Sequence, residues 1–339
     1  MTRNPRAARA VRGRLAAPFG ATALALVVLT MTATTVAAGS AVEASVDAGT
    51  LRITGSPSAD RIALGLSAAD PNQLQVDVGD DGTADFTFDR GTFAAIDVRA
   101  GNGADTVRID QVNGIFTTSE ATRMYGQNGD DSLHGGTGAE VFVGGRGDDV
   151  VDGNAGADTA FLGSGDDTFV WDQGDGSDVV EGASGSDTLV FNGFGANENM
   201  AVAPSGGRVR FTRTQGGIVM DLDDVEAIDA RPAGGTDTVT VNDVSGTDLA
   251  RLDVDLAATI GGAASDAQAD TVNVNGTTGD DSIAANAVGS AVEVSGLAPL
   301  VRITHADPAL DSLVIDGLTG DDDVAIDPAL AALILVSAP

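Results

Sequence analysis

The sequence predicts an all-β fold in which short parallel strands stack as a solenoid, with further β-rich regions on both sides. Three observations lead to this prediction. Nine-residue units follow one another between Gly126 and Val190, alternating apolar and polar runs occur outside them, and no long helical period appears after the N-terminal segment. A nine-residue unit is too small to bury its single apolar side chain, so neighbouring units must stack to form a core.

The units keep glycine and an acidic residue at fixed positions. In register they read GQNGDDSLH from Gly126, GGTGAEVFV from Gly135, GGRGDDVVD from Gly144, GNAGADTAF from Gly153 and LGSGDDTFV from Leu162, and, after an insertion of Trp171 and Asp172, QGDGSDVVE from Gln173 and GASGSDTLV from Gly182. Glycine at the first, second and fourth positions permits a tight bend with positive φ. The carboxylate at the sixth position places a hard oxygen ligand on that bend, as calcium requires.

The last three residues of each unit predict a short strand with one side chain directed inward. The predicted inward side chains are Leu133, Phe142, Val151, Ala160, Phe169, Val180 and Leu189. Stacked on one another, they would form the hydrophobic core of the solenoid.

The pattern G-G-x-G-x-D-x-U-x, with U a large apolar residue, resembles the calcium-binding nonapeptide of RTX (haemolysin-type) repeat proteins. This resemblance implies a parallel β-roll with two units per coil and an ion between stacked turns, held by sixth-position carboxylates and loop carbonyls. It implies up to about five calcium sites. One edge would carry Asp131, Asp149, Asp167 and Asp187 with Gly129, Gly147 and Gly165, and the other edge Glu140, Asp158 and Asp178.

Three departures and three echoes accompany the strict units. Glu140 has a longer side chain than aspartate, Leu162 replaces the first glycine, and the Trp171–Asp172 insertion breaks the period. Partial units elsewhere place Asp105, Asp281 and Asp322 at the sixth position, and Asp237 lies in a fainter trace. These echoes are either further metal ligands or plain β-turns rich in glycine and aspartate. Asp281 and Asp322 have no acidic partner eighteen residues away, so we expect them to be isolated.

The flanking regions predict additional short strands. The expected strands are Thr50–Thr54, Gln73–Val78, Asp85–Asp89, Val209–Phe211, Thr238–Val241 and Thr271–Val274, with a short strand or helix at Pro328–Val336. Residues 79–82 predict a hairpin turn. Asp77, Asp81 and Asp85 surround it, but Gly79 stands where an EF-hand would place a third ligand, so we predict a plain turn.

The N-terminus has the features of an export signal. Arginines at the start are followed by an apolar stretch over residues 21–29 and by Val36-Ala37-Ala38, which resembles a cleavage site. We therefore expect a signal peptide at 1–38, an N-terminal β region at 39–98, the repeat array at 99–191 and a C-terminal β region with degenerate repeats at 192–339. The mature chain would be secreted, extracellular or at the cell surface, with no membrane span. The chain has no cysteine, so no disulfide can stabilise it.

The charge balance favours cations as partners. The sequence has 50 acidic against 18 basic residues, a formal net charge of −32. Five arginines lie in the first fourteen positions, so the remainder has 50 acidic residues against 13 arginines, about −37. Such a charge repels nucleic acid and anionic lipid, and it opposes folding unless cations neutralise it. We therefore expect calcium binding to be coupled to folding, with Ca²⁺ as the only cofactor.

The sequence predicts no catalytic centre. His134 and His305 are the only histidines, and neither an H-E-x-x-H nor a G-x-S-x-G motif occurs. Two alternatives remain open: a cell-surface adhesin or matrix protein with an unknown extracellular partner, and a carbohydrate-active β-helix enzyme that uses acidic residues. Arg208, Arg210 and Arg213 could receive an anionic ligand, but we expect an ordinary solvent-exposed face.

Overall fold

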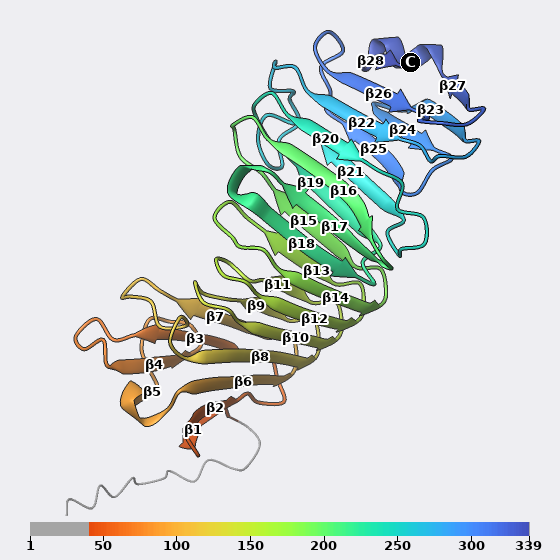
Figure 1. Ribbon diagram of the computed structural model, residues 1–339. Helices are drawn as coiled ribbons and strands as arrows, with labels where there is room; N and C mark the ends of the chain where they lie inside the picture. Colours follow the sequence, from red (N-terminus) through yellow and green to blue (C-terminus); the bar gives the residue numbers. More distant parts are fainter. Residues whose placement is uncertain (1–40, 339) are drawn as a thin grey trace, which may run out of the picture. The chain divides into compact units, whose positions relative to one another are not determined.

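The computed structural model describes residues 41–338, which form two large β-sheets and no α-helix (Figure 1). The expected all-β solenoid is therefore confirmed. The expected signal peptide at 1–38 lies outside the described residues. Within 41–338, no helix is both long and apolar enough to cross a bilayer.

The first sheet, called sheet A, contains fourteen strands. In spatial order they are β1 (Glu43–Asp47), β2 (Thr50–Thr54), β6 (Ala95–Asn102), β8 (Ala121–Asn128), β10 (Val141–Arg146), β12 (Thr159–Ser164), β14 (Val179–Ser184), β18 (Ile218–Asp223), β17 (Arg208–Arg213), β16 (Asn199–Ser205), β20 (Thr238–Val241), β22 (Thr271–Asn275), β26 (Ser312–Asp316) and β28 (Leu335–Ser337).

The second sheet, called sheet B, also contains fourteen strands. In spatial order they are β27 (Asp323–Ile326), β23 (Ser282–Val288), β24 (Ala291–Ser295), β25 (Leu300–Thr304), β21 (Arg251–Asp255), β19 (Ala227–Arg231), β15 (Thr188–Asn192), β13 (Thr168–Trp171), β11 (Val150–Asp152), β9 (Ser132–His134), β7 (Thr106–Asp110), β3 (Arg61–Leu66), β4 (Gln73–Val78) and β5 (Phe86–Asp89). Three short 3₁₀ segments lie between strands: η1 (Arg90–Thr92), η2 (Gln215–Gly217) and η3 (Pro328–Ala332).

From β6 to β15 the chain alternates strictly between the two sheets, so each coil contributes one strand to each. In the uninterrupted repeats the strands pair in parallel with partners eighteen residues away: Phe142 opposes Ala160 in sheet A, and Val151 opposes Phe169 in sheet B. The spacing is 26 residues between β6 and β8 and twenty between β12 and β14. Two nine-residue units therefore make one coil. This is the register that the period of nine predicts.

The core lies between the sheets, where alternate side chains of every strand point inward. All seven predicted inward side chains are buried, with exposed fractions of 0–1%. Buried aliphatic and aromatic residues continue from Val42 to Ile334 as one cluster, so the flanking regions share the core of the array.

Two three-stranded meanders interrupt the simple winding. In sheet A, β18 pairs in parallel with β14, β17 runs antiparallel, and β16 pairs in parallel with β20. In sheet B, β25, β24 and β23 connect β21 to β27 in the same way. Each meander lengthens a coil without ending the stack, because both of its outer strands present a parallel edge to a neighbour.

The strands expected outside the array are confirmed to within one or two residues at their ends. Residues 79–82 form the expected turn, in which Asp77 accepts hydrogen bonds from the backbone N–H groups of Asp81 and Gly82. The expected terminal segment contains both structures considered, the 3₁₀ segment η3 and the strand β28.

Candidate metal centre

One acidic residue directly precedes most strands of the solenoid. In sheet A these residues are Glu120, Glu140, Asp158, Asp178, Glu198, Asp237, Asp270 and Asp311, and in sheet B they are Asp60, Asp105, Asp131, Asp149, Asp167, Asp187, Glu226, Asp281 and Asp322. Every fully buried acidic side chain within residues 41–338 occupies this position. In the strict repeats it is the sixth position of the unit.

On the sheet B edge, the carboxylates form a hydrogen-bonded ladder. The backbone N–H of Asp131 donates to Asp149 Oδ1 at 2.8 Å, and that of Asp149 donates to Asp167 Oδ1 at 2.7 Å. Asp167 continues the ladder to Asp187 at 2.9 Å. The expected stacking of these four residues is therefore confirmed.

The sheet B ladder is longer than the strict array. Asp105 donates its N–H to Asp131 Oδ1 at 2.8 Å, so this echo stacks on the first strict unit. Asp60 donates to Asp105 Oδ1 at 2.7 Å, and Asp187 donates to Glu226 Oε2 at 2.7 Å. Asp60 and Glu226 were missed by sequence reasoning, because the strict unit does not extend to either.

The sheet A edge repeats the arrangement. Glu140 donates its N–H to Asp158 Oδ1 at 2.7 Å, and Asp158 donates to Asp178 Oδ1 at 2.8 Å. Glu140 itself turns one carboxylate oxygen back to its own loop, where Oε2 accepts from the N–H of Gly136 at 2.8 Å. The longer side chain therefore closes its own turn.

Eight carboxylates of the two ladders have a second oxygen that is buried without a hydrogen-bond partner. This holds for Oδ2 of Asp105, Asp131, Asp149, Asp158, Asp167, Asp178 and Asp187 and for Oε1 of Glu140. A buried carboxylate oxygen without a partner is costly unless a cation or a proton neutralises it. A row of such hard oxygens fits Ca²⁺, which is bound by carboxylate and carbonyl oxygens.

Backbone carbonyls converge on the same places. A Cβ atom added to Gly144 would lie 2.5 Å from Asp149 Oδ2 and 2.4 Å from the carbonyl oxygen of Leu162, one coil further on. Gly126 has the same surroundings, with Asp131 Oδ2 at 2.4 Å and the carbonyl oxygen of Gly144 at 2.7 Å. Leu162 thus supplies the carbonyl that a first-position glycine supplies elsewhere. Its departure from the repeat leaves this oxygen in place.

The fourth-position glycines hold the turns in close contact. Gly147 has φ +113°, and a Cβ atom on it would lie 2.3 Å from the carbonyl oxygen of Gly129. Gly165 has φ +136° and the same relation to Gly147, at 2.0 Å. Only glycine fits both the positive φ and the close approach of the neighbouring turn.

Burial raises the pKa of the ladder carboxyl groups. The pKa of Asp131 is raised to about 6 and that of Asp149 to about 7, first by burial and then by neighbouring acidic groups, against the lowering effect of the ladder hydrogen bond. On the other edge, burial raises the pKa of Asp158 to about 9. Without a bound cation, these pKa values keep a proton on Asp158 at neutral pH and leave Asp149 only partly ionised, whereas Asp131 is mostly ionised there.

A second, exposed ladder runs along the fifth position of the repeat. The N–H of Asp148 donates to Asp130 Oδ1 at 2.9 Å, and that of Asp166 donates to Asp148 Oδ1 at 2.8 Å. Sequence reasoning missed these residues as a stack. The repeated Asp-Asp pairs in three alternate units were the available signal.

The two-residue insertion leaves the ladders continuous. Trp171 is buried, and its Nε1 donates a hydrogen bond to the carbonyl oxygen of Gly176 at 2.8 Å. The backbone N–H of Asp172 donates to Asp175 Oδ2 at 2.5 Å. The extra residues form a local loop, and the ladder spacing rises from eighteen to twenty residues. The insertion therefore changes one turn and not the register.

The C-terminal echoes at Asp281 and Asp322 are not isolated, contrary to our expectation. Asp281 donates its N–H to Asp322 Oδ1 at 3.0 Å, because the β23–β24–β25 meander brings units 41 residues apart into contact. The two oxygens of Asp281 accept from the N–H and Oγ1 of Thr277, at 2.7 and 2.9 Å. Unlike those of the array, this carboxylate has protein partners for both oxygens.

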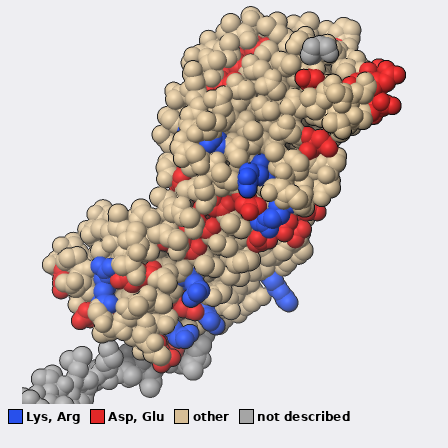
Figure 2. All heavy atoms as spheres, in the orientation of Figure 1, with Lys and Arg blue, Asp and Glu red and all other residues tan. Residues whose placement is uncertain are grey.

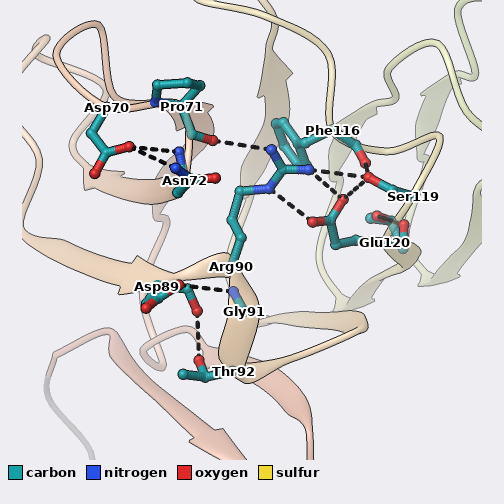
Figure 3. Close-up of polar contacts among 11 residues, drawn as sticks. Asp70, Pro71, Asn72, Asp89, Arg90, Gly91, Thr92, Phe116, Ser119 and Glu120 are labelled. Atoms are coloured by element: carbon teal, nitrogen blue, oxygen red, sulfur yellow. Dashed lines mark hydrogen bonds and ion pairs between the residues drawn. The ribbon is translucent and has the colours of Figure 1, made fainter.

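Arginines neutralise two of the buried acidic residues that precede strands. Arg90 forms a two-point ion pair with buried Glu120, which precedes β8, through contacts of 2.8 and 3.0 Å (Figure 3). Arg213 pairs with Glu198, which precedes β16, and both side chains are buried. The expectation that Arg213 belongs to a solvent-exposed face is therefore wrong.

Arg208 is also engaged with acidic side chains. It contacts Glu181, Asp221 and Asp223 at 2.7–3.0 Å. Asp223 additionally lies in a partly exposed group with Asp224 and Asp248, whose carboxylate oxygens are within 4.8 Å of one another. On the face shown in Figure 2, arginines lie beside acidic side chains in the same manner.

Comparison with protein families agrees with this geometry. The family model of the RTX calcium-binding nonapeptide repeat matches residues 117–149, 134–169 and 174–192. Residues 117–192 carry RTX calcium-binding nonapeptide repeats. These RTX repeats imply calcium binding, in agreement with the buried aspartate ladders. A search among curated proteins gives no significant match.

Proposed function

We propose that the chain is a secreted calcium-binding β-roll protein whose folding is coupled to extracellular calcium. The observation that carries this proposal is the row of buried, unpartnered carboxylate oxygens on both edges of the RTX array. At Asp131, Asp149 and Asp187, a backbone carbonyl oxygen of the next coil lies near the same first-position residue as the unpartnered oxygen. The sixth-position carboxylates and first-position carbonyls would hold the ions, and calcium would supply charge neutralisation and bridging between coils.

The energy of calcium binding is large enough to decide folding. Extracellular calcium modules have dissociation constants of about 10⁻⁴–10⁻³ M. If free calcium exceeds that constant tenfold, each site stabilises the fold by about 1.4 kcal/mol. Four or five sites would contribute about 6–7 kcal/mol, which is comparable with the whole stability of a small domain.

Secretion is supported by the N-terminal sequence and by the repeat itself, which is typical of secreted proteins. A chain with this excess of acidic residues would stay unfolded where calcium is scarce and fold where it is abundant. Calcium is abundant on the extracellular side, so the exported chain would fold there.

The experiment that tests the proposal is a calcium titration of the full chain, followed by circular dichroism. We expect β structure to increase at millimolar calcium and to be lost on adding chelator. Magnesium should replace calcium poorly, because it demands a smaller octahedral shell and releases water reluctantly. Identical folded spectra with and without calcium would refute calcium-coupled folding.

We also propose that the chain has no catalytic centre, although one constellation invites a test. On the outer face of sheet B, Ser132 Oγ lies 2.8 Å from His134 Nε2, and His134 Nδ1 lies 3.5 Å from Asp152 Oδ2. The histidine side chain is 38% exposed, so water reaches the group, which disfavours catalysis. Wild type and Ser132→Ala should be equally inactive on ester and glycan substrates. An activity abolished by Ser132→Ala would establish an enzyme.

A further inference from the structure

The C-terminal region contains a second buried ladder outside the RTX repeats, which we call the C-terminal acidic ladder: Glu198, Asp237, Asp270 and Asp311. Glu198 donates its N–H to Asp237 Oδ1 at 2.7 Å, Asp237 to Asp270 Oδ1 at 2.8 Å, and Asp270 to Asp311 Oδ1 at 2.9 Å. These residues are 39, 33 and 41 positions apart in the chain. The ladder thus repeats the geometry of the array without the nonapeptide.

The two ends of this ladder are engaged by other protein groups. Glu198 pairs through Oε1 with the buried guanidinium of Arg213, although its Oε2 is buried without a hydrogen-bond partner. Asp311 uses both carboxylate oxygens, because Oδ1 accepts from Asp270 and Oδ2 accepts from the N–H of Asp307 at 2.6 Å. Arg213 thus neutralises the charge of Glu198, and backbone N–H groups satisfy both oxygens of Asp311.

The interior of the ladder is different. Oδ2 of Asp237 and Oδ2 of Asp270 are buried without a hydrogen-bond partner, and the two residues are only 1% and 2% exposed. These are the same unpartnered oxygens that the array presents. Their burial, combined with a negative charge, calls for a cation.

A loop brings a third carboxylate to the same place. Asp266 lies between β21 and β22, and its Oδ2 accepts from the N–H of Gly235 at 2.7 Å, two residues before Asp237. The charged neighbours that raise the pKa of Asp237, after burial, are Asp270, Glu198 and Asp266. For Asp270 they are Asp311 and Asp266. All these neighbours are acidic, whereas Glu198 has Arg213.

We infer that Asp237 and Asp270 bind a divalent cation of the calcium type on the sheet A edge of the C-terminal region. Their two unpartnered buried oxygens supply hard-oxygen ligands, and Asp266, whose oxygens accept from the N–H groups of Gly235 and Gln268, adds negative charge nearby. Calcium suits the site better than magnesium, because the two ligands belong to separate coils and so do not impose a compact octahedron. This cation would perform between β20 and β22 the neutralisation that Arg213 performs at Glu198.

The test is Asp270→Asn in the full chain. The side-chain oxygen of asparagine can keep the hydrogen bond from the Asp237 N–H, while its NH₂ group replaces Oδ2, the atom assigned to the cation. With a cation site, the variant should bind at least one calcium ion fewer in calorimetric titration, and calcium should raise its unfolding midpoint less than that of wild type. Without a site, removing an uncompensated buried charge should leave calcium stoichiometry unchanged and raise the midpoint in chelator and calcium alike. That second result would overturn the inference.

Asp149→Asn is the matched variant in the RTX array, since it makes the same atomic change at the same ladder position. It should lose array ions and retain the C-terminal ion, and the double variant should lose both sets. If Asp149→Asn leaves the calcium stoichiometry unchanged while Asp270→Asn reduces it, calcium binding by the RTX array is refuted and the C-terminal site is supported. If only Asp149→Asn reduces the calcium stoichiometry, calcium binding by the RTX array is supported and the C-terminal site is refuted. Asp243→Asn, at a partly exposed position in the loop after β20, should bind as many calcium ions as wild type.

Discussion

At the scale of single residues, the ladder carboxylate has two oxygens with different roles. In Asp149, Oδ1 accepts the N–H of Asp131 and so fixes the spacing between coils, while Oδ2 stays free of protein donors and faces a carbonyl. Asparagine would keep only the first role. The longer Glu140 fills the first role differently, by binding its own loop. The preference of the repeat for aspartate follows from both demands together.

The stacked geometry predicts unequal effects of removing aspartates. Asp149→Ala should remove two calcium sites, because Asp149 lies between Asp131 and Asp167 in the ladder. The expected loss is up to about 3 kcal/mol at saturating calcium. Asp281→Ala should remove fewer ions, because both of its oxygens already have protein donors. Calorimetric titration of the two variants measures this, and equal loss of sites would contradict it.

Glycine stacking predicts a difference between two substitutions at nearly identical φ. Gly147 (φ +113°) has the Gly129 carbonyl oxygen 2.3 Å from the position of an added Cβ, whereas Gly174 (φ +114°) has nothing within 4 Å. Gly174→Ala should cost about 1–2 kcal/mol, the backbone strain alone. Gly147→Ala should add about 1–3 kcal/mol for the steric conflict between turns. Urea unfolding in saturating calcium compares them, and equal midpoints would show that the turns can separate without cost.

At the scale of elements, an acidic residue before a strand is the recurring unit of this fold, and the nonapeptide is its most compact form. Sequence reasoning found the array because a period of nine is local and visible. It missed the rungs at Glu198, Asp270 and Asp311, because meanders and loops separate them by irregular distances. The segments after Asp237, Asp270 and Asp311 read TVTV, TVNV and SLVI, so an acid before an alternating strand was the remaining signal. Which strands become neighbours depends on the meanders, and no local pattern encodes that.

The β16–β17–β18 meander predicts that Arg213 is essential to its own element. Its guanidinium pairs with buried Glu198 and stacks over Trp171 and Phe194, 5.5 and 5.0 Å from the ring centroids. Arg213→Gln leaves a buried carboxylate without its counter-ion and should cost about 3–5 kcal/mol. Adding Glu198→Gln should recover part of this loss, since it removes the uncompensated charge. The free energy of unfolding from urea titration gives both values.

Arg251→Gln is the control for this prediction. Arg251 contacts Asp253 at 2.8 Å, but its side chain is 53% exposed. An exposed pair of this kind contributes about 0–1 kcal/mol. If Arg213→Gln were no more destabilising than Arg251→Gln, the buried pair would be dispensable to the meander.

At the scale of the whole molecule, the described chain contains one core and two lines of buried negative charge along its edges. The core contacts favour stacking of the coils, while the charges oppose it until cations or protons neutralise them. Arginines do this at Glu120 and Glu198. Elsewhere in residues 41–338, the negative charge of the ladder carboxylates is neutralised only by protons or cations from the solvent. Stability should therefore respond to calcium and to pH through the same carboxylates.

The final prediction concerns the sign of that pH response. An unfolded aspartate has a pKa of about 3.9, whereas the folded pKa values of Asp131 and Asp149 are about 6 and about 7. Between these values the calcium-free folded chain holds protons that the unfolded chain releases, so its stability should fall as pH rises from about 4 to 7. Calcium requires deprotonated carboxylates, so its apparent affinity should rise over the same interval.

Between about pH 5 and about pH 7.5, the calcium-free urea midpoint and the increase in midpoint produced by calcium should therefore change in opposite directions. The calcium-free midpoint should be higher at the lower pH, because protons neutralise the ladders there. The stabilisation produced by adding calcium should be greater at the higher pH, because fewer protons compete for the carboxylates. Asp149→Asn should weaken both trends, since its amide does not titrate. A calcium-free protein that gains stability between about pH 5 and about pH 7.5 would show that the buried carboxylates remain ionised in the fold, neutralised by something other than protons or calcium.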